Sequence, residues 1–203
     1  MRLILASASP RRADLLRAAG FRFEIFPVDV DERFRDGETA EHYVARLAEE
    51  KARAAQNRGP GAHFGANEQN GLPDPVFLGA DTVVVCGGEL LGKPADRPDA
   101  ERMLRLLAGR THEVLTGVCL LIADRSITRV ERSQVRMSPM TGAEIAWYIK
   151  SGEPMDKAGG YAVQGLASRF IEAVEGSYSN VVGLPVAAVY GLLKQLGCDI
   201  LTI

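Results

Sequence analysis

The sequence has few cysteines, no long apolar run and no large excess of either charge. Among its 203 residues, Cys86, Cys119 and Cys198 lie too far apart to indicate a redox dithiol or a shared metal. No stretch approaches the run of about 20 apolar residues that a membrane-spanning helix needs. The formal net charge is -2, so no global field attracts nucleic acid or an anionic membrane. We therefore expect a cytoplasmic protein with reduced, buried thiols and with neither nucleic acid nor a membrane as partner.

The length and composition suit one domain. With 46% hydrophobic residues, the chain is long enough to bury a sizeable core. Residues 57–75 are rich in Gly, Pro and Asn and show no periodicity, which indicates a surface insertion and not a domain boundary. We predict a single domain over residues 1–203, with a flexible insertion at 57–75. Two lobes of one compact unit are compatible with this length.

Hydrophobic patterning predicts an α/β fold built on a mixed sheet. Residues 3–6 form a short apolar run that indicates a buried strand, and a helix is expected to begin at Pro10 with Ser9 as its N-cap. The alternating and helical patterns further predict strands at 23–28, 76–86, 89–91, 111–124 and 126–137, and helices at 40–56, 99–107, 141–151 and 185–196. Because hairpins are mixed with helices, a regular doubly wound sheet is not expected.

The turn at residues 7–12, Ser-Ala-Ser-Pro-Arg-Arg, combines hydroxyls, a helix start and two adjacent guanidiniums. Free N–H groups at a helix N-terminus and arginine side chains both favour phosphate. The alternative is a solvated basic first turn. Against it, positive side chains there oppose the helix dipole at a cost of roughly a few tenths of a kcal/mol. We predict an anion site at this turn.

Two charged residues stand where the apolar pattern predicts burial. Asp81 interrupts the strand at 76–86, and an ionised carboxylate there is costly unless a cation or hydrogen bonds compensate it. We therefore predict a general base or a metal ligand at Asp81. Lys51 continues the apolar stripe of the helix at 40–56. A lysine in that place usually extends its ammonium to solvent, and spacing alone favours that interpretation over a functional one.

The remaining polar segments match no common nucleotide-binding or nucleophile motif. Residues 156–165 and 176–180 contain glycines and small polar residues, but neither fits a Walker loop or a dinucleotide fingerprint. Lys93, held extended by Pro94, is weak evidence by itself because exposed loop lysines are ordinary. The histidines are scattered and form no Ser-His-Asp or Cys-His pairing, which disfavours covalent catalysis.

In their order along the chain, these segments resemble the Maf-like nucleoside triphosphate pyrophosphatases. The resemblance runs from about residue 3 to 196 and rests on Ser7-Ala8-Ser9-Pro10-Arg11-Arg12, Glu50-Lys51-Ala52, Gly79-Ala80-Asp81-Thr82, Lys93-Pro94, Asp156-Lys157-Ala158-Gly159 and the segment from Asn180 to Pro185. Within that family, residues 161–165 resemble the branch that acts on dTTP and UTP. The branch that acts on 7-methyl-GTP tends to carry Glu in the place of Gln164.

The resemblance implies an α/β fold with an elongated curved mixed sheet flanked by helices. It also implies two lobes with a nucleotide cleft between them, and often a homodimer. It further implies metal-assisted water attack at the α-phosphate of dTTP or UTP, which gives the nucleoside monophosphate and pyrophosphate. Asp81 is then the proton acceptor or a metal ligand, and Glu32 a second carboxylate for Mg²⁺ or Mn²⁺. The implied substrate-binding residues are Ser7, Arg11, Arg12, Lys51 and Lys93 toward the triphosphate, with Arg11, Thr82 and Gln164 bearing on base choice.

Elementary chemistry agrees with these roles. The charge of leaving pyrophosphate requires cations, and a side-chain amide can both donate to and accept from the O4 and N3–H edge of uracil or thymine. An ionised Glu in place of Gln164 cannot donate. Two alternatives stay open: the same chemistry on 7-methyl-GTP or another non-standard nucleotide, and a non-catalytic nucleotide-binding regulator of septum formation. The presence of Asp81 counts against the regulator.

Overall fold

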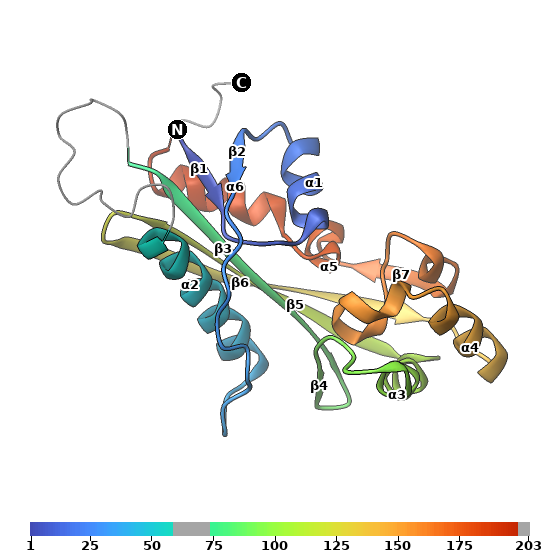
Figure 1. Cartoon of the computed structure of the whole chain (residues 1–203). Coiled ribbons are helices and arrows are strands. Elements are labelled where there is room, and N and C mark those ends of the chain that lie inside the picture. The colour runs from blue at the N-terminus through green and yellow to red at the C-terminus, as the bar shows by residue number, and fades with distance from the viewer. Residues whose placement is uncertain (59–73, 199–203) are drawn as a thin grey trace. The chain divides into compact units, whose positions relative to one another are not determined.

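The computed structural model describes residues 1–58 and 74–198 (Figure 1). The chain forms two compact units. The first comprises Met1–Asp81, Gly117–Val130 and Gly183–Ile203, and the second comprises Thr82–Thr116 and Glu131–Val182. Of the predicted insertion at 57–75, residues 59–73 lie outside the described residues, and the first two residues belong to a helix. The single domain over 1–203 stays a prediction.

The strands form a mixed sheet of seven in the order β2-β1-β3-β5-β6-β7, with β4 paired to β3. β1 runs parallel to β2 and to β3, whereas the pairs β3–β4 and β6–β7 are antiparallel. Helices flank this sheet, so the predicted α/β fold class is confirmed. The strands are β1 (Leu3–Leu5), β2 (Phe23–Ile25), β3 (Val76–Cys86), β4 (Glu89–Leu91), β5 (Thr111–Ile122), β6 (Arg125–Met137) and β7 (Ile171–Glu175).

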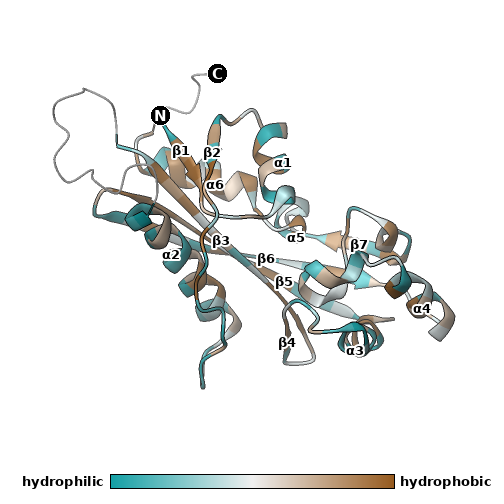
Figure 2. Cartoon of the chain, in the orientation of Figure 1, coloured by the Kyte–Doolittle hydropathy of each residue, from teal (hydrophilic) through white to brown (hydrophobic). Residues whose placement is uncertain are grey.

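In the first unit, helices cover both faces of the sheet. Successive side chains of a strand point to opposite faces, and β1 follows this rule. Leu3 and Leu5 pack with α1 (Pro10–Ala18) and α6 (Val186–Gln195), whereas Ile4 packs with α2 (Ala40–Arg58). Figure 2 shows hydrophobic and hydrophilic residues alternating around α2, as expected of a helix with one buried side.

Two glycines bring the backbone of α2 unusually close to the sheet. A Cβ atom on Gly79 of β3 would lie 2.0 Å from the carbonyl oxygen of Ala48, and one on Gly117 of β5 would lie 2.2 Å from that of Val44. No side chain fits at either position. Lys51 lies on the same stretch of α2. Asp81 follows Gly79 by two residues and therefore faces the same side of β3, so this close packing brings Lys51 to Asp81.

The second unit has one core, which is built on the ends of the long strands. Val84 of β3 and Val135 of β6 pack with Leu104 of α3 and Ile145 of α4. Asp96 caps α3 by accepting from the N–H of Asp99 at 2.8 Å. The helical elements are α3 (Arg97–Leu107), α4 (Gly142–Lys150), α5 (Tyr178–Val182) and the short 3₁₀ helices η1 (Glu153–Asp156), η2 (Ala158–Gly160) and η3 (Leu166–Phe170). Within the described ranges, none of the helices combines the length and hydropathy needed to cross a bilayer.

Several predicted element boundaries were wrong for identifiable reasons. The strand expected at 23–28 ends at Ile25, since Pro27 has no N–H for a ladder. The helix expected from Asp99 begins at Arg97 because Asp96 is its N-cap. Elements β7 and α5 were not predicted. Cys86 and Cys119 are buried free thiols, as expected, but Cys198 is only partly buried.

Candidate active site

The centre of the candidate site is a buried lysine between two carboxylates. The Nζ atom of Lys51 lies 2.7 Å from Oδ1 of Asp81 and 2.6 Å from Oε1 of Glu32. Lys51 and Asp81 are 6% and 8% exposed, so the ammonium of Lys51 is buried. The spacing had favoured an ammonium that extends to solvent, and the structure differs from that expectation. Of the two kinds of compensation considered for Asp81, a cation or hydrogen bonds, the structure shows a cation, Lys51, whereas the predicted role of Asp81 as a general base or metal ligand stays a prediction.

The segment that carries Glu32 is held in place by α2. Tyr43 donates a hydrogen bond from its hydroxyl to the carbonyl oxygen of Glu32 at 2.9 Å, and Arg46 donates to the carbonyl oxygen of Arg33 at 3.2 Å. Burial, together with the charges of Asp81 and Glu32, raises the pKa of Tyr43 to about 12, so the hydroxyl keeps its proton at neutral pH. Glu32 therefore approaches Lys51 from a turn that is fixed by two side chains of one helix.

Arg12 ties three segments of the first unit together. Its guanidinium donates to the carbonyl oxygens of Gly183 at 2.8 Å and Ala80 at 2.9 Å, and to the hydroxyl of Ser7 at 3.1 Å. The strand-to-helix turn, the residue before Asp81 and the loop before α6 thus meet at one side chain. Arg12 thus connects segments of the first unit that lie far apart in the sequence.

Ser7 organises the first turn of α1, although Ser9 was expected to cap it. Ser9 lies at the N-cap position but makes no side-chain capping hydrogen bond, whereas the hydroxyl of Ser7 accepts from the N–H of Ser9 at 3.2 Å. Burial lowers the pKa of Arg12, the charges of Asp81 and Glu32 oppose this shift, and the charge of Arg11 adds to it. The two guanidiniums repel each other, which an anion at this turn would relieve.

In the second unit, Thr82 belongs to a buried hydrogen-bond network. Its hydroxyl lies 2.9 Å from that of Thr116, and Thr116 donates to the carbonyl oxygen of Asn180 at 3.2 Å. Asn180 is fully buried and donates from its amide to the carbonyl oxygen of Val114 and the hydroxyl of Ser133, each at 3.0 Å. Asn180 therefore fixes β5 and β6, and Thr116 of β5 in turn contacts Thr82 of β3.

Lys93 and Gln164 are exposed residues on loops of the second unit. In the antiparallel β3–β4 hairpin, Val84 pairs with Leu91. Thr82 precedes Val84 by two residues and Lys93 follows Leu91 by two, so both lie at the end of the hairpin away from its turn. The N–H of Gly159 donates to the carbonyl oxygen of Gly92 at 2.9 Å, which joins the Lys93 loop to the segment that leads to Gln164.

The structure thus brings six of the predicted residues together in the first unit and places three in the second. The first group is Ser7, Arg11, Arg12, Glu32, Lys51 and Asp81, and the second is Thr82, Lys93 and Gln164. The two groups are adjacent in sequence at the peptide bond between Asp81 and Thr82. The expected nucleotide cleft and the individual residue roles stay predictions.

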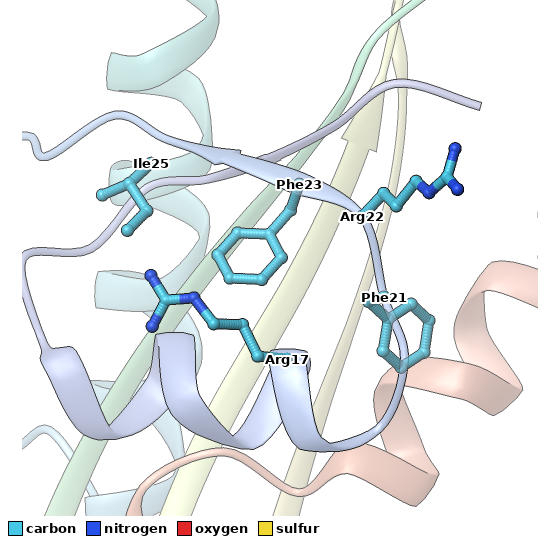
Figure 3. A pocket seen from close by; sticks show the side chains of 5 residues that line it. All are labelled: Arg17, Phe21, Arg22, Phe23 and Ile25. Carbon is cyan, nitrogen blue, oxygen red and sulfur yellow. The ribbon is translucent and has the colours of Figure 1, made fainter. Parts of the chain in front are cut away.

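A hollow of about 470 Å³ lies in the first unit near the end of α1 and beside β2 (Figure 3). None of its lining residues belongs to the groups above, and Figure 3 shows Arg17 extending toward Phe23, whose ring centre is 5.6 Å from the guanidinium carbon. The lining residues are Arg17, Phe21, Arg22, Phe23 and Ile25. We assign no part of the site to this hollow.

Comparison with known proteins agrees with the geometry. The family model described as "Maf-like protein" matches residues 2–196. The chain belongs to this family. It is 46% identical over 197 residues to a protein named "dTTP/UTP pyrophosphatase" from Koribacter versatilis, with 97% of this chain and 95% of that protein covered. It is 48% identical over 200 residues to one of the same name from Hahella chejuensis, with 98% and 94% covered.

A solved structure, the Ham1 protein of Staphylococcus aureus, matches with a TM-score of 0.47 and 11% identity over 97% of this chain and 100% of that one. At these values the likeness adds nothing to the fold described above.

The Glu32–Asp81 pair offers the donor type that a hard divalent cation prefers. The oxygens Oε1 of Glu32 and Oδ1 of Asp81 both contact Nζ of Lys51, so the two carboxylates lie side by side, with the ammonium at the point on which these oxygens converge. Mg²⁺ is commonly bound through one or two carboxylates plus phosphates of the substrate. Across residues 1–58 and 74–198, no group of three or more His, Cys, Asp or Glu side chains could hold a metal. Glu32 and Asp81 alone are therefore too few to bind a metal, and a cation at this place needs nucleotide phosphates and water as its remaining ligands.

Sequence reasoning missed the residues that support the Gln164 loop. Tyr148 and Glu153 both bond to that loop, yet nothing in their spacing distinguishes them from an ordinary helix aromatic and a surface acid. The one available signal was the segment at 152–157, Gly-Glu-Pro-Met-Asp-Lys, in which an acid precedes a proline directly after a helix.

Proposed function

We propose that this protein is a nucleoside triphosphate pyrophosphatase that hydrolyses dTTP and UTP to the nucleoside monophosphate and pyrophosphate. The observation that carries the proposal is the contact of buried Lys51 with buried Asp81 and with the more exposed Glu32, in a family whose relatives, matched over nearly their full length, carry the name dTTP/UTP pyrophosphatase. The reaction adds one water molecule across the anhydride. The water oxygen bonds to the α-phosphorus, and the bridging oxygen leaves with pyrophosphate.

Asp81 acts as the proton acceptor in this proposal. Its second carboxylate oxygen is not the one that bonds Lys51, and the ammonium of Lys51 balances the charge of this buried carboxylate. General base catalysis by a positioned carboxylate contributes about 10²–10⁴-fold. The Lys51–Asp81 contact thus both stabilises the charge of the base and fixes its orientation.

The turn at residues 7–12 and Lys51 bind the triphosphate. The start of α1, the hydroxyl of Ser7 and the two adjacent guanidiniums of Arg11 and Arg12 provide positive potential on one side of Asp81. Arg12 also stabilises the turn itself through its bonds to Gly183 and Ala80. Lys93 adds a further cation from the β3–β4 hairpin end. These cations stabilise the charge that develops on leaving pyrophosphate.

In this proposal, Glu32 and Asp81 would hold a divalent cation, Mg²⁺ or Mn²⁺, which would neutralise phosphate charge and polarise a phosphoryl oxygen. We expect exhaustive chelation to abolish hydrolysis and added Mg²⁺ or Mn²⁺ to restore it. We also expect Glu32→Gln to weaken Mn²⁺ binding in the presence of nucleotide, measured by the electron paramagnetic resonance of free Mn²⁺. Glu24→Gln, which alters an exposed partner of Arg2, serves as the control. Full activity in the chelated protein contradicts a metal role.

Gln164 reads the base in this proposal, since its amide can donate to a uracil or thymine carbonyl and accept from N3–H. We expect Gln164→Glu to reduce UTP and dTTP hydrolysis far more than purine nucleotide hydrolysis. An unpaired buried polar group costs roughly 1–3 kcal/mol, which corresponds to roughly 5- to 150-fold in kcat/KM. Gln195→Glu, an exposed change on α6, is the matched control. A uniform loss on all nucleotides would show that Gln164 does not read the base.

A screen of common and modified nucleoside triphosphates, with separate detection of pyrophosphate and orthophosphate, tests the proposed function as a whole. We expect UTP and dTTP to be preferred substrates and pyrophosphate to be the first product. A preference for 7-methyl-GTP would overturn the substrate assignment, and binding of UTP without turnover would favour a regulatory protein.

A further inference from the structure

The loop that carries Gln164 is fixed on its N-terminal side by two buried side chains. The N–H of Ala162 donates to the hydroxyl of Tyr148 at 3.2 Å, and the hydroxyl of Tyr161 lies 2.7 Å from Nε2 of His112. Burial lowers the pKa of His112 to about 4, so the ring is neutral at pH 7. Tyr148 is fully buried, and Tyr161 is 6% exposed.

On the C-terminal side of Gln164, one carboxylate holds the chain. The N–H of Leu166 donates to Oε2 of Glu153 at 3.0 Å, and the N–H of Ala167 donates to Oε1 of the same carboxylate at 3.4 Å. These two amides open the helix η3, where N–H groups have no partner within the helix. Glu153 supplies that partner from 13 and 14 residues away in the sequence.

A hydrogen bond joins the two sides of the loop. The hydroxyl of Tyr148 donates to Oε1 of Glu153 at 2.8 Å. Burial first, and then this bond, raise the pKa of Tyr148 above its ordinary value, so the hydroxyl keeps its proton. One bonded pair of side chains therefore holds the backbone both two residues before and two residues after Gln164.

Gly165 shows how closely the loop rests on this pair. A Cβ atom on Gly165 would lie 2.5 Å from Oε2 of Glu153 and 2.8 Å from its Cδ. The backbone directly after Gln164 thus lies against the carboxylate. A side chain at position 165 would push Glu153 away from the amides that it binds.

We propose that Glu153, with Tyr148, positions Gln164 and thereby sets the base selectivity of the enzyme. This inference rests on the proposed base-reading role of Gln164. Gln164 is itself exposed, and the bonds of its loop come from neighbouring residues. A side chain discriminates between bases only if its backbone is fixed to within about 0.5 Å, and packing and hydrogen bonds of supporting residues provide that precision.

The first test is Glu153→Gln, which keeps the size of the side chain but replaces one accepting oxygen with a donor. The single oxygen of the glutamine amide cannot replace both carboxylate oxygens, so the N–H of either Leu166 or Ala167 loses its acceptor. We expect the ratio of kcat/KM for UTP to that for GTP to fall by on the order of tenfold, while GTP turnover changes little. Glu172→Gln, at an exposed ion pair with Arg136 in the same unit, is the matched control. An equal loss on UTP and GTP indicates a merely structural role and overturns the inference.

Two further variants keep the inference testable if Glu153→Gln does not fold. Tyr148→Phe retains the buried ring and removes only the two hydrogen bonds, and Gly165→Ala retains Glu153 and displaces its carboxylate. We expect both to lower the UTP to GTP ratio in the same direction. We also expect faster hydrogen exchange at the amides of Ala162 and Leu166. Unchanged exchange and an unchanged ratio in these variants overturn the inference.

Gln164→Glu separates this inference from the proposed function. If Gln164→Glu abolishes the UTP preference but the Glu153, Tyr148 and Gly165 variants retain it, the positioning role alone is wrong. If the wild-type protein has no preference for UTP, or if Gln164→Glu leaves the preference unchanged, the base-reading role is wrong and the inference fails with it.

Discussion

We expect Asp81→Asn to abolish hydrolysis of UTP and dTTP while the protein still folds and binds nucleotide. Asparagine keeps the shape of the side chain, and its oxygen can still accept from Nζ of Lys51, which retains its contact with Glu32. It cannot take a proton from water. Turnover should fall by about 10²–10⁴-fold, the usual contribution of a positioned general base. Steady-state kinetics and nucleotide binding by calorimetry measure the two effects separately.

The matched control is Asp14→Asn, which removes the charge of an exposed aspartate that pairs with Arg17. It should leave turnover unchanged. If Asp81→Asn hydrolyses UTP at the wild-type rate, Asp81 is not the proton acceptor, and the contact of Lys51 with Asp81 and Glu32 has only a structural role.

The second large effect is expected for Lys51→Met, which keeps an apolar stem of similar length and removes the ammonium. Turnover should fall by roughly tenfold to a thousandfold on every nucleotide alike, because the residue stabilises developing charge. The free energy of unfolding should fall as well. Removing one partner of a fully buried ion pair costs about 3–5 kcal/mol. Because the Glu32 side chain is 47% exposed, solvent screens part of the interaction between the charges, and the loss of unfolding free energy should be smaller than that.

Lys150→Met on α4, an exposed change in the other unit, serves as the control for Lys51→Met. Urea denaturation of both variants gives the stability change, and kinetics on UTP, dTTP and GTP give the catalytic one. A change in base preference with unaltered turnover would assign Lys51 to the base end of the nucleotide.

Local chemistry predicted part of the site correctly from sequence. The cost of an isolated carboxylate in a strand predicted that a cation or hydrogen bonds compensate Asp81, and the fixed φ of Pro10 predicted the start of α1. The identity of the partner was not available. Whether Lys51 extends to solvent or contacts Asp81 depends on how close α2 lies to β3, and the missing side chain at Gly79 decides that distance.

Other features depend on contacts between segments that are far apart in the sequence. Asn180 fixes Thr82 through Thr116, and Arg12 reaches a carbonyl 171 residues away. Glu153 binds backbone amides, which carry no side-chain signal at all. The strand β2 shows the opposite case: Pro27 was visible in the sequence, and its missing N–H gave sufficient reason to end the strand early.

The most direct test of the proposed reaction is the position of the water oxygen in the products. UTP is hydrolysed in H₂¹⁸O under single-turnover conditions, and UMP and pyrophosphate are separated and analysed by mass spectrometry. Attack at the α-phosphorus, with the bridging oxygen leaving in pyrophosphate, predicts one ¹⁸O atom in UMP and none in pyrophosphate. Label in pyrophosphate instead would mean attack at the β-phosphorus and would contradict the roles given to Asp81 and Lys51.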